Sequence, residues 1–396
     1  MLNVQTIALE CPKSSKVAYE LSIPLTGFSP DVHEVSIIGP GGQDVPHSST
    51  DEGVQFGRCD GPGVVARFTA EVRDKSENAE VKDRVTIEVV VLPETEPAVR
   101  DAIGAVISEM KVQISGASHF SSDTASKAFQ LQKSFGEMAA VELLRRLAFD
   151  RSDTITVLRP LLLLRDMIGR PTAQWLPRMV FAVTSELAGS ISHFGTADTL
   201  LDVLERLALP PHEKWFYLIR AAQELQRARG RVFSLLSKIT PADNRTETAS
   251  AVLEMCELVV DGRQQACELF QEFCWAPAAP RVLEWMEADR SVISAGCGFL
   301  IKVDDKTAAQ RLRSLFERSD MGGDYYAIAN CLATWQDREA VPAILRKLAG
   351  CHMVYADDLV RALLRFGAEV VPQIQKIQQE SGPDKAKRIQ EALAAK

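Results

Sequence analysis

Cysteine side chains are the residues in this sequence that could most readily hold a metal. Cys256, Cys267 and Cys274 follow one another at steps of 11 and 7 residues, which places them near one face of a continuous helix. A structural zinc site needs four Cys or His ligands, usually in two closely spaced pairs, and the sequence has no C-x-x-C spacing. We therefore expect these thiols to be buried in a helical core, and we expect neither a metal nor a cofactor.

Nucleophilic chemistry has equally little support. Cys297 lies in Ser-Ala-Gly-Cys-Gly-Phe, which lacks the G-x-S-x-G frame of a nucleophile elbow. Cys351 and His352 are adjacent, so their side chains point apart. The six histidines show no H-E-x-x-H spacing, and no glycine-rich phosphate loop is present. The sequence thus predicts no catalytic residue and makes an enzyme the less favoured class.

Charge divides the chain into two parts. The 396 residues are 46% hydrophobic and 25% charged, as in folded soluble proteins. Residues 1–96 hold 8 Lys and Arg against 16 Asp and Glu, which equals the whole net charge of −8, so the rest is balanced. An acidic chain repels a phosphate backbone, and nucleic acid is therefore an unfavoured partner.

Basic residues nevertheless gather in two helical segments. Within 220–238, Arg220, Arg227, Arg229, Arg231 and Lys238 stand against Glu224 alone, and several arginines lie within 145–178. Three readings stay open: a solvated or interface face, docking against the acidic N-terminal part, and nucleic-acid binding.

The first 93 residues have the period of β-strands. Val85, Ile87, Val89 and Val91 alternate with other residues, and turns rich in Gly and Pro separate such segments. We expect an acidic antiparallel β-sandwich over 1–93. The linker expected over 94–97 contains Pro97, a residue suited to the first turn of a following helix.

From residue 98 the period is that of α-helices. We expect a helical domain over 98–260, either degenerate repeats or a separate bundle, and an α-solenoid over 261–396. Thr196 is expected to cap one helix and Gly230 to end another. The expected helices of the first part are 98–112, 122–134, 136–148, 153–168, 173–189, 197–207, 211–229 and 245–260.

A repeat of 30 residues marks the C-terminal part. The Glu-Ala-Val-Pro block at 339–342 aligns with Glu-Val-Val-Pro at 369–372, each after an apolar helix, and Asp337 is expected to cap the helix that follows it. These blocks resemble the short HEAT-like repeats of phycobilisome-lyase relatives over roughly 322–380. The resemblance implies a stacked helical solenoid and no particular chemistry.

These features favour a cytoplasmic, non-enzymatic scaffold that binds a protein partner, with the sandwich as a docking or oligomerisation domain. Neither a signal peptide nor a membrane span is expected. A HEAT-like enzyme is an alternative, either a DNA glycosylase using Asp166 beside Arg165 and Arg170 or a chromophore lyase, and a structural subunit of a large assembly is another. Solenoids often bind partners on a concave face, which we expect the second helices of the pairs to line. The expected binding residues are Arg313, Arg346, Lys347, Lys376, Arg220, Arg227 and Arg231.

Overall fold

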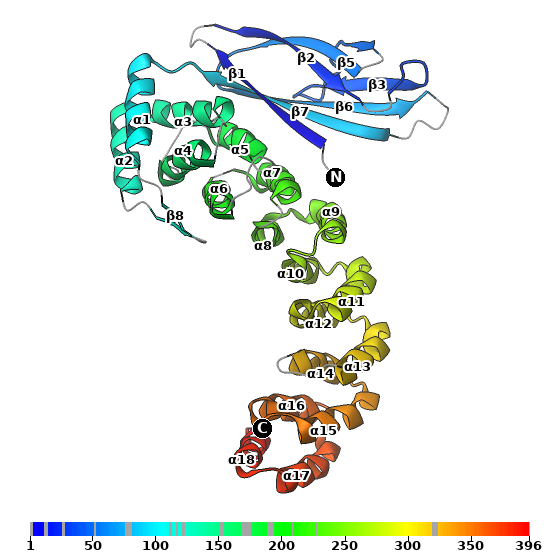
Figure 1. The fold of residues 1–396 in the computed structure, drawn as a ribbon. Coiled ribbons are helices and arrows are strands. Elements are labelled where there is room, and N and C mark those ends of the chain that lie inside the picture. The colour runs from blue at the N-terminus through cyan, green and yellow to red at the C-terminus, as the bar shows by residue number, and fades with distance from the viewer. Residues whose placement is uncertain are drawn as a thin grey trace. The chain divides into compact units, whose positions relative to one another are not determined.

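The chain forms two compact units, residues 1–241 and 242–396, each of which is described by itself (Figure 1). The computed structural model describes residues 3–11, 15–25, 28–50, 53–75, 81–110, 113–115, 118–120, 123–150, 154–167, 176–187, 194–207, 209–225, 228–318 and 324–395.

The first unit begins with a β-sandwich of seven strands in two sheets. One sheet has the order β1-β7-β6-β3 and the other β2-β5-β4. All pairs are antiparallel except β1 and β7, which run parallel, so the larger sheet is mixed. The strands are β1 (Asn3–Cys11), β2 (Val17–Pro24), β3 (His33–Ile38), β4 (Ser48–Thr50), β5 (Gly53–Asp60), β6 (Val64–Asp74) and β7 (Val81–Pro93).

From Val85 onward, strand β7 is buried on both faces. Ile87 and Val89 point into the sandwich core, where they join Phe56 and Phe68. The intervening side chains of β7 are also buried and face the other way, because neighbours on a strand point to opposite faces. The larger sheet therefore has a second covered face.

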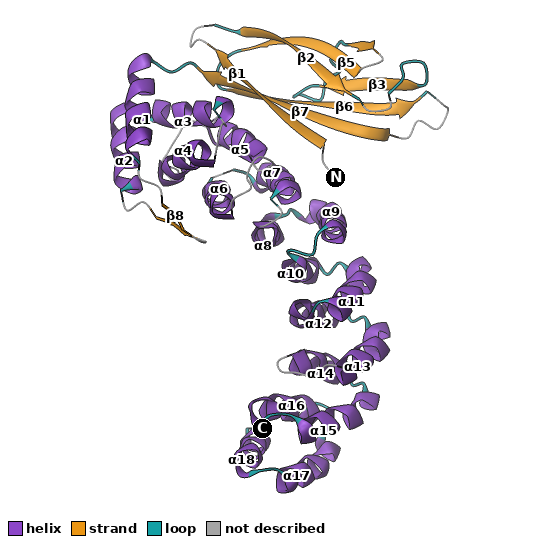
Figure 2. Cartoon of the chain, in the orientation of Figure 1, coloured by secondary structure: helices purple, strands orange, loops and turns teal. Residues whose placement is uncertain are grey.

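Helices of the same unit cover that second face. Helices α3, α5 and α7 lie beside β1, β6 and β7, as the purple and orange elements of Figure 2 show. A short hairpin, β8 (Gln113–Ser115) and β9 (Ser118–Phe120), follows α1. The helices are α1 (Pro97–Glu109), α2 (Thr124–Phe135), α3 (Glu137–Phe149), α4 (Thr154–Met167), α5 (Leu176–Leu187), α6 (Phe194–Arg206), α7 (Pro211–Glu224) and α8 (Arg229–Ile239).

The second unit is a stack of helix pairs. In each pair a short 3-10 turn precedes the second helix, and the buried residue that ends the turn is Ala278, Ala308, Ala340 or Val370. Its helices are α9 (Arg245–Leu258), α10 (Arg263–Phe273), α11 (Ala279–Ala288), α12 (Ile293–Val303), α13 (Ala309–Arg318), α14 (Asp324–Thr334), α15 (Val341–Gly350), α16 (Ala356–Leu364), α17 (Val371–Glu380) and α18 (Pro383–Ala394).

The joint within three of these pairs has one repeated geometry. Cys274, Asp304 and Gln336 each follow the first helix with a left-handed backbone, at φ of 53°, 52° and 58°. The next amide then bonds back to the last turn, as in Trp275 N–H to Phe270 O over 3.0 Å. This is the Schellman arrangement, which satisfies the terminal carbonyls of each first helix and fixes the turn into the second.

The second unit has two layers of helices. Helices α10, α12, α14, α16 and α18 pack closely on one another, whereas α11, α13, α15 and α17 contact each other far less (Figure 1). A stack whose layers differ in this way curves toward the closely packed one. We call α10, α12, α14 and α16 the inner layer, and α11, α13, α15 and α17 the outer layer.

The expected β-sandwich followed by an all-helical solenoid is confirmed, with a mixed rather than fully antiparallel larger sheet. The helical-repeat character of the C-terminal part is also confirmed. The domain boundaries at 93, 97 and 260 stay predictions.

Three local expectations were wrong. Gly230 lies inside α8, and α7 ends earlier because the Arg229 guanidinium caps its last carbonyls, Ala222 O at 3.0 Å and Gln223 O at 3.3 Å. Thr196 lies within α6, which begins at Phe194. Asp337 makes no capping hydrogen bond and binds Arg313 instead.

Candidate functional site

The cysteines with helical spacing are core residues. Cys256 and Cys267 are fully buried in α9 and α10. Burial, and then the neighbouring Cys256 thiol, raise the pKa of Cys267, which disfavours the thiolate needed for nucleophilic or metal chemistry. Cys274 is exposed at the end of α10. Among the described residues no three His, Cys, Asp or Glu side chains converge as metal ligands would.

Cys297 lies inside a helix, and the Cys351-His352 pair lies where one helix ends and a 3-10 turn begins. Cys297 is buried within α12. Burial raises the pKa of Cys351. His352 precedes a 3-10 turn, and its Nδ1 accepts from the Val354 amide at 3.4 Å. The His352 contact stabilises the start of this turn, and burial disfavours the thiolate form of Cys351.

The carboxylate considered for a glycosylase is held by its neighbour. Arg165 donates to both oxygens of Asp166, over 2.9 and 3.3 Å. Arg170, the other arginine considered for this alternative, lies outside the described residues. The described surroundings of Asp166 are those of an ion pair.

Arg220 faces the β-sheet. Its side chain is buried, donates to Thr6 Oγ1 over 2.7 Å and lies 3.9 Å from Glu88 Oε2. Glu88 is fully buried and also accepts from Arg67 at 2.9 Å and from the Tyr217 hydroxyl at 2.9 Å. Burial and then the Glu88 carboxylate raise the pKa of Tyr217, so its hydroxyl stays a donor. The sequence leaves three interpretations open for the basic segments. For Arg220 the contacts with Thr6 and Glu88 fit one of them, docking against the acidic N-terminal part.

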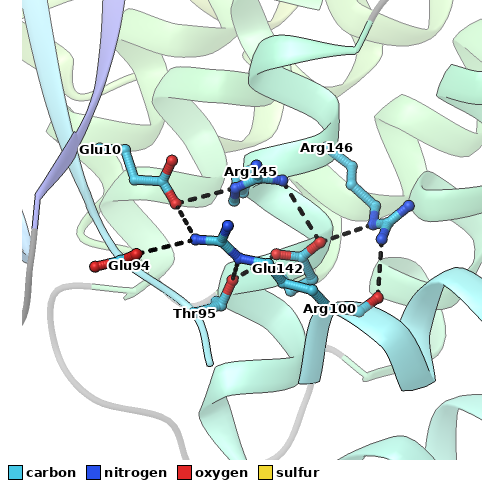
Figure 3. A network of polar contacts seen from close by, with 7 residues as sticks. All are labelled: Glu10, Glu94, Thr95, Arg100, Glu142, Arg145 and Arg146. Carbon is cyan, nitrogen blue, oxygen red and sulfur yellow. Dashed lines mark hydrogen bonds and ion pairs between the residues drawn. The ribbon is translucent and has the colours of Figure 1, made fainter. Parts of the chain in front are cut away.

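A second polar network joins the sheet to α1 and α3 (Figure 3). Glu10 of β1 accepts hydrogen bonds from Arg100 over 2.8 Å and from Arg145 over 3.0 Å. Fully buried Glu142 accepts from Thr95 over 2.6 Å and from Arg146 over 2.8 Å. Thr95, in the segment expected to be a linker, is therefore buried between the sheet and the helices.

Arg231 is engaged within its own unit. It pairs with Asp202 at 2.6 Å, Glu205 at 3.1 Å and Asp198 at 3.3 Å, which ties α8 to α6. Arg227 lies outside the described residues.

The remaining expected site residues lie on the outer layer, although we expected the inside of the curve. Arg313 on α13 pairs with Asp337 at 2.7 Å and Glu339 at 2.8 Å, and Arg346 on α15 pairs with Glu317 at 2.9 Å. Lys376 is exposed on α17, and Lys347 on α15 is half-buried. The structure thus brings these four residues to one layer and engages both arginines with neighbouring repeats.

Ion pairs link the second helices of successive repeats. An arginine on each of α11, α13 and α15 reaches a glutamate near the end of α9, α11 and α13, respectively. These glutamates recur every 30 residues. The Arg311 guanidinium hydrogen bonds to Glu287 and lowers the pKa of that carboxyl. We call these pairs the outer ladder; they are Arg281–Glu257 at 3.3 Å, Arg311–Glu287 at 2.8 Å and Arg346–Glu317 at 2.9 Å.

The inner layer presents a regular grid of side chains that sequence reasoning missed. Each inner helix contributes three residues at i, i+4 and i+8, a spacing that places them on one face. All twelve are exposed or half-buried. We call them the inner face; they are Gln264, Glu268 and Glu272, then Ser294, Gly298 and Lys302, then Tyr326, Asn330 and Thr334, then Asp357, Arg361 and Arg365.

Several charged side chains of the inner face have no ion-pair partner among the residues that the structure describes. Glu268, Glu272 and Lys302 form no ion pair with any described residue. Arg365 hydrogen bonds to Thr334 Oγ1 over 3.0 Å and has no carboxylate partner within the described ranges, whereas Arg361 pairs with Asp357 at 3.6 Å. The four-residue spacing of polar positions was visible in the sequence, but solvated helix faces carry it as well.

Comparisons with known proteins add no assignment. No protein-family model matches the chain, and a search of curated proteins finds no relative of it. Among the described helices, none combines the length and apolar character required to cross a bilayer.

Proposed function

We propose that this protein is a non-enzymatic scaffold or adaptor that binds a protein partner through its helical repeats. HEAT-like packing is part of the proposal and is supported by the repeated joint at Cys274, Asp304 and Gln336. The inner face carries the proposed binding surface. The cytoplasm is the compartment we propose, since Cys267 and Cys331 are buried cysteines that form no disulfide.

The observation that carries this proposal is the contrast between the two layers. Arginines of the outer ladder have carboxylate partners in the neighbouring repeat. Glu268, Glu272 and Lys302 on the inner face do not have such partners among the described residues. Exposed charges that a fold does not use internally remain available to steer and select a partner.

The β-sandwich has an exposed face that could serve as a second contact surface. Helices cover its larger sheet, so the free face belongs to β2 and β5. There Ala18 pairs with Cys59, Glu20 with Gly57 and Ser22 with Gln55 across the strands. The outward side chains of β2 and β5 on this face are exposed. We propose this face as the joint if the protein docks or oligomerises through the sandwich.

Affinity purification of the tagged full-length protein from native lysate, with and without nuclease, tests the proposed function. A stoichiometric protein partner that survives nuclease treatment is expected. Nucleic acid or a bound pigment in place of a protein would instead support the glycosylase or lyase alternatives. Mass that grows with concentration, measured by light scattering, would support a structural subunit.

A further inference from the structure

The inner face is a strip that crosses four helices. Neighbouring packed helices lie about 8–10 Å apart, so three steps from α10 to α16 span about 24–30 Å. An extended chain advances about 3.3 Å per residue, so about eight residues cover the strip. This length suits a short linear segment of another protein.

Charge changes sign along the strip. Helix α10 contributes Glu268 and Glu272, and α12 contributes Lys302. Helix α16 contributes Arg365 together with the Arg361–Asp357 pair, whose charges offset each other. Helix α14 presents uncharged side chains between them, including half-exposed Tyr326. The inner face is thus acidic at its α10 end and basic over α12 and α16.

The curvature of the stack favours an extended occupant. The inner layer lies on the concave side, and a straight helix about 10 Å across cannot follow a surface that curves along its length. An extended segment bends at each residue and can contact all four helices. Its charges must run opposite to those of the strip for both ends to be attracted.

We propose that the inner face binds an extended segment of a partner protein, with basic residues where the segment crosses α10 and acidic residues where it crosses α12 and α16. This inference rests on the proposed scaffold function and adds the chemistry of the partner. Glu268 and Glu272 select the basic end, and Lys302 and Arg365 select the acidic end.

Selection from a random 12-residue peptide library displayed on phage, with full-length protein as bait, tests this chemistry. Three baits are compared: wild type, Glu268→Lys with Glu272→Lys, and Glu284→Lys with Glu380→Lys. The last is matched in charge change and lies on the outer layer. The enriched peptides are then synthesised and their affinities measured by fluorescence anisotropy.

We expect wild type and the outer-layer control to enrich the same peptides, with basic residues toward one end and acidic residues toward the other. The inner-face variant should weaken these peptides by about tenfold or more and enrich peptides without the basic end. Enriched peptides without this polarity, peptides that bind the inner-face variant equally well, or no enrichment at all would overturn the inference. A nuclease-resistant partner in the purification above would still support the scaffold function in any of these cases.

Discussion

Arg346 on α15 lies 2.9 Å from the Glu317 carboxylate on α13, and the pair joins two successive second helices of the repeats. The same relationship connects Arg311 with Glu287 one repeat earlier. Because these helices pack loosely on one another, charged side chains bridge much of the space between them. The charge of Arg346 therefore has an internal role, which shifts attention to the inner face as the surface for a partner.

Removal of one carboxylate of the outer ladder should reduce the acid sensitivity of the fold. Arg311 lowers the pKa of Glu287, so the ionised carboxyl stabilises the folded state at neutral pH. That contribution is present above the ordinary Glu pKa of about 4.3 and is lost as pH falls through the lower folded-state pKa. In Glu287→Gln, the melting temperature should fall less between pH 5 and pH 3 than in wild type.

Circular dichroism melts across this pH range provide the measurement. Glu380→Gln is the control, since Glu380 is exposed on α17 and forms no ion pair with any described residue. Equal pH slopes for wild type, Glu287→Gln and the control would show that the ladder contributes nothing to stability.

Glu88 should be the most sensitive carboxylate of the first unit. In Glu88→Ala, Arg67 and Arg220 lose a fully buried partner and Tyr217 loses its acceptor. Loss of one partner from a buried pair costs about 3 kcal/mol or more of unfolding free energy. Urea unfolding of the variant should show that loss, whereas Glu34→Ala, exposed on β3, should change stability by less than about 0.5 kcal/mol. A Glu88→Ala loss as small as that of the control would mean that the network does not hold the sheet to α7.

The β-sandwich should depend on its covering helices. Val90 and Leu92 of β7 are fully buried on the face opposite the sandwich core. A fragment ending at residue 96 exposes both side chains, so we expect it to bind a hydrophobic dye and to melt without cooperativity. The fragment 1–241, a compact unit, should melt cooperatively. A sharp melt of 1–96 alone would refute this dependence.

The repeated joint predicts a stabilising substitution. Cys274 has a φ of 53°, a region that costs a side-chain-bearing residue free energy and that glycine adopts freely. After the greater flexibility of glycine in the unfolded chain is subtracted, Cys274→Gly should raise the unfolding free energy by about 0.5 kcal/mol. Cys274→Ala keeps the Cβ and serves as the control in chemical denaturation. Equal stabilities of the two variants would show that the joint carries no backbone strain.

The elements could be predicted where one periodic face is buried. The alternation along β7 is visible because Val85, Ile87, Val89 and Val91 fill the sandwich core. The 30-residue repeat is visible because Ile344 and Ile374, at equivalent positions of α15 and α17, are both buried and apolar. The alternation alone suggested one buried and one solvated face of β7, whereas Val90 and Leu92 on the second face are fully buried and apolar. Their presence is the sequence signal for the contact with the helices.

The candidate site could not be predicted in the same way. Whether Arg346 meets a partner or Glu317 depends on the distance between two helices about 30 residues apart, and no local pattern encodes that distance. The break between α7 and α8 was missed for a similar reason. It depends on the reach of Arg229 to the carbonyls of Ala222 and Gln223, and not on the glycine that follows.

The most direct test of the scaffold proposal compares partner retention by three full-length proteins in nuclease-treated native lysate. They are wild type, the inner-face variant Glu268→Lys with Glu272→Lys, and the outer-layer variant Arg346→Glu, Lys347→Glu and Lys376→Glu. Each is first checked for a cooperative melt well above the assay temperature. We expect wild type and the outer-layer variant to retain one stoichiometric protein and the inner-face variant to lose it. Retention by the inner-face variant with loss by the outer-layer variant would contradict the assignment of the binding face, and no protein partner for wild type would contradict the scaffold function itself.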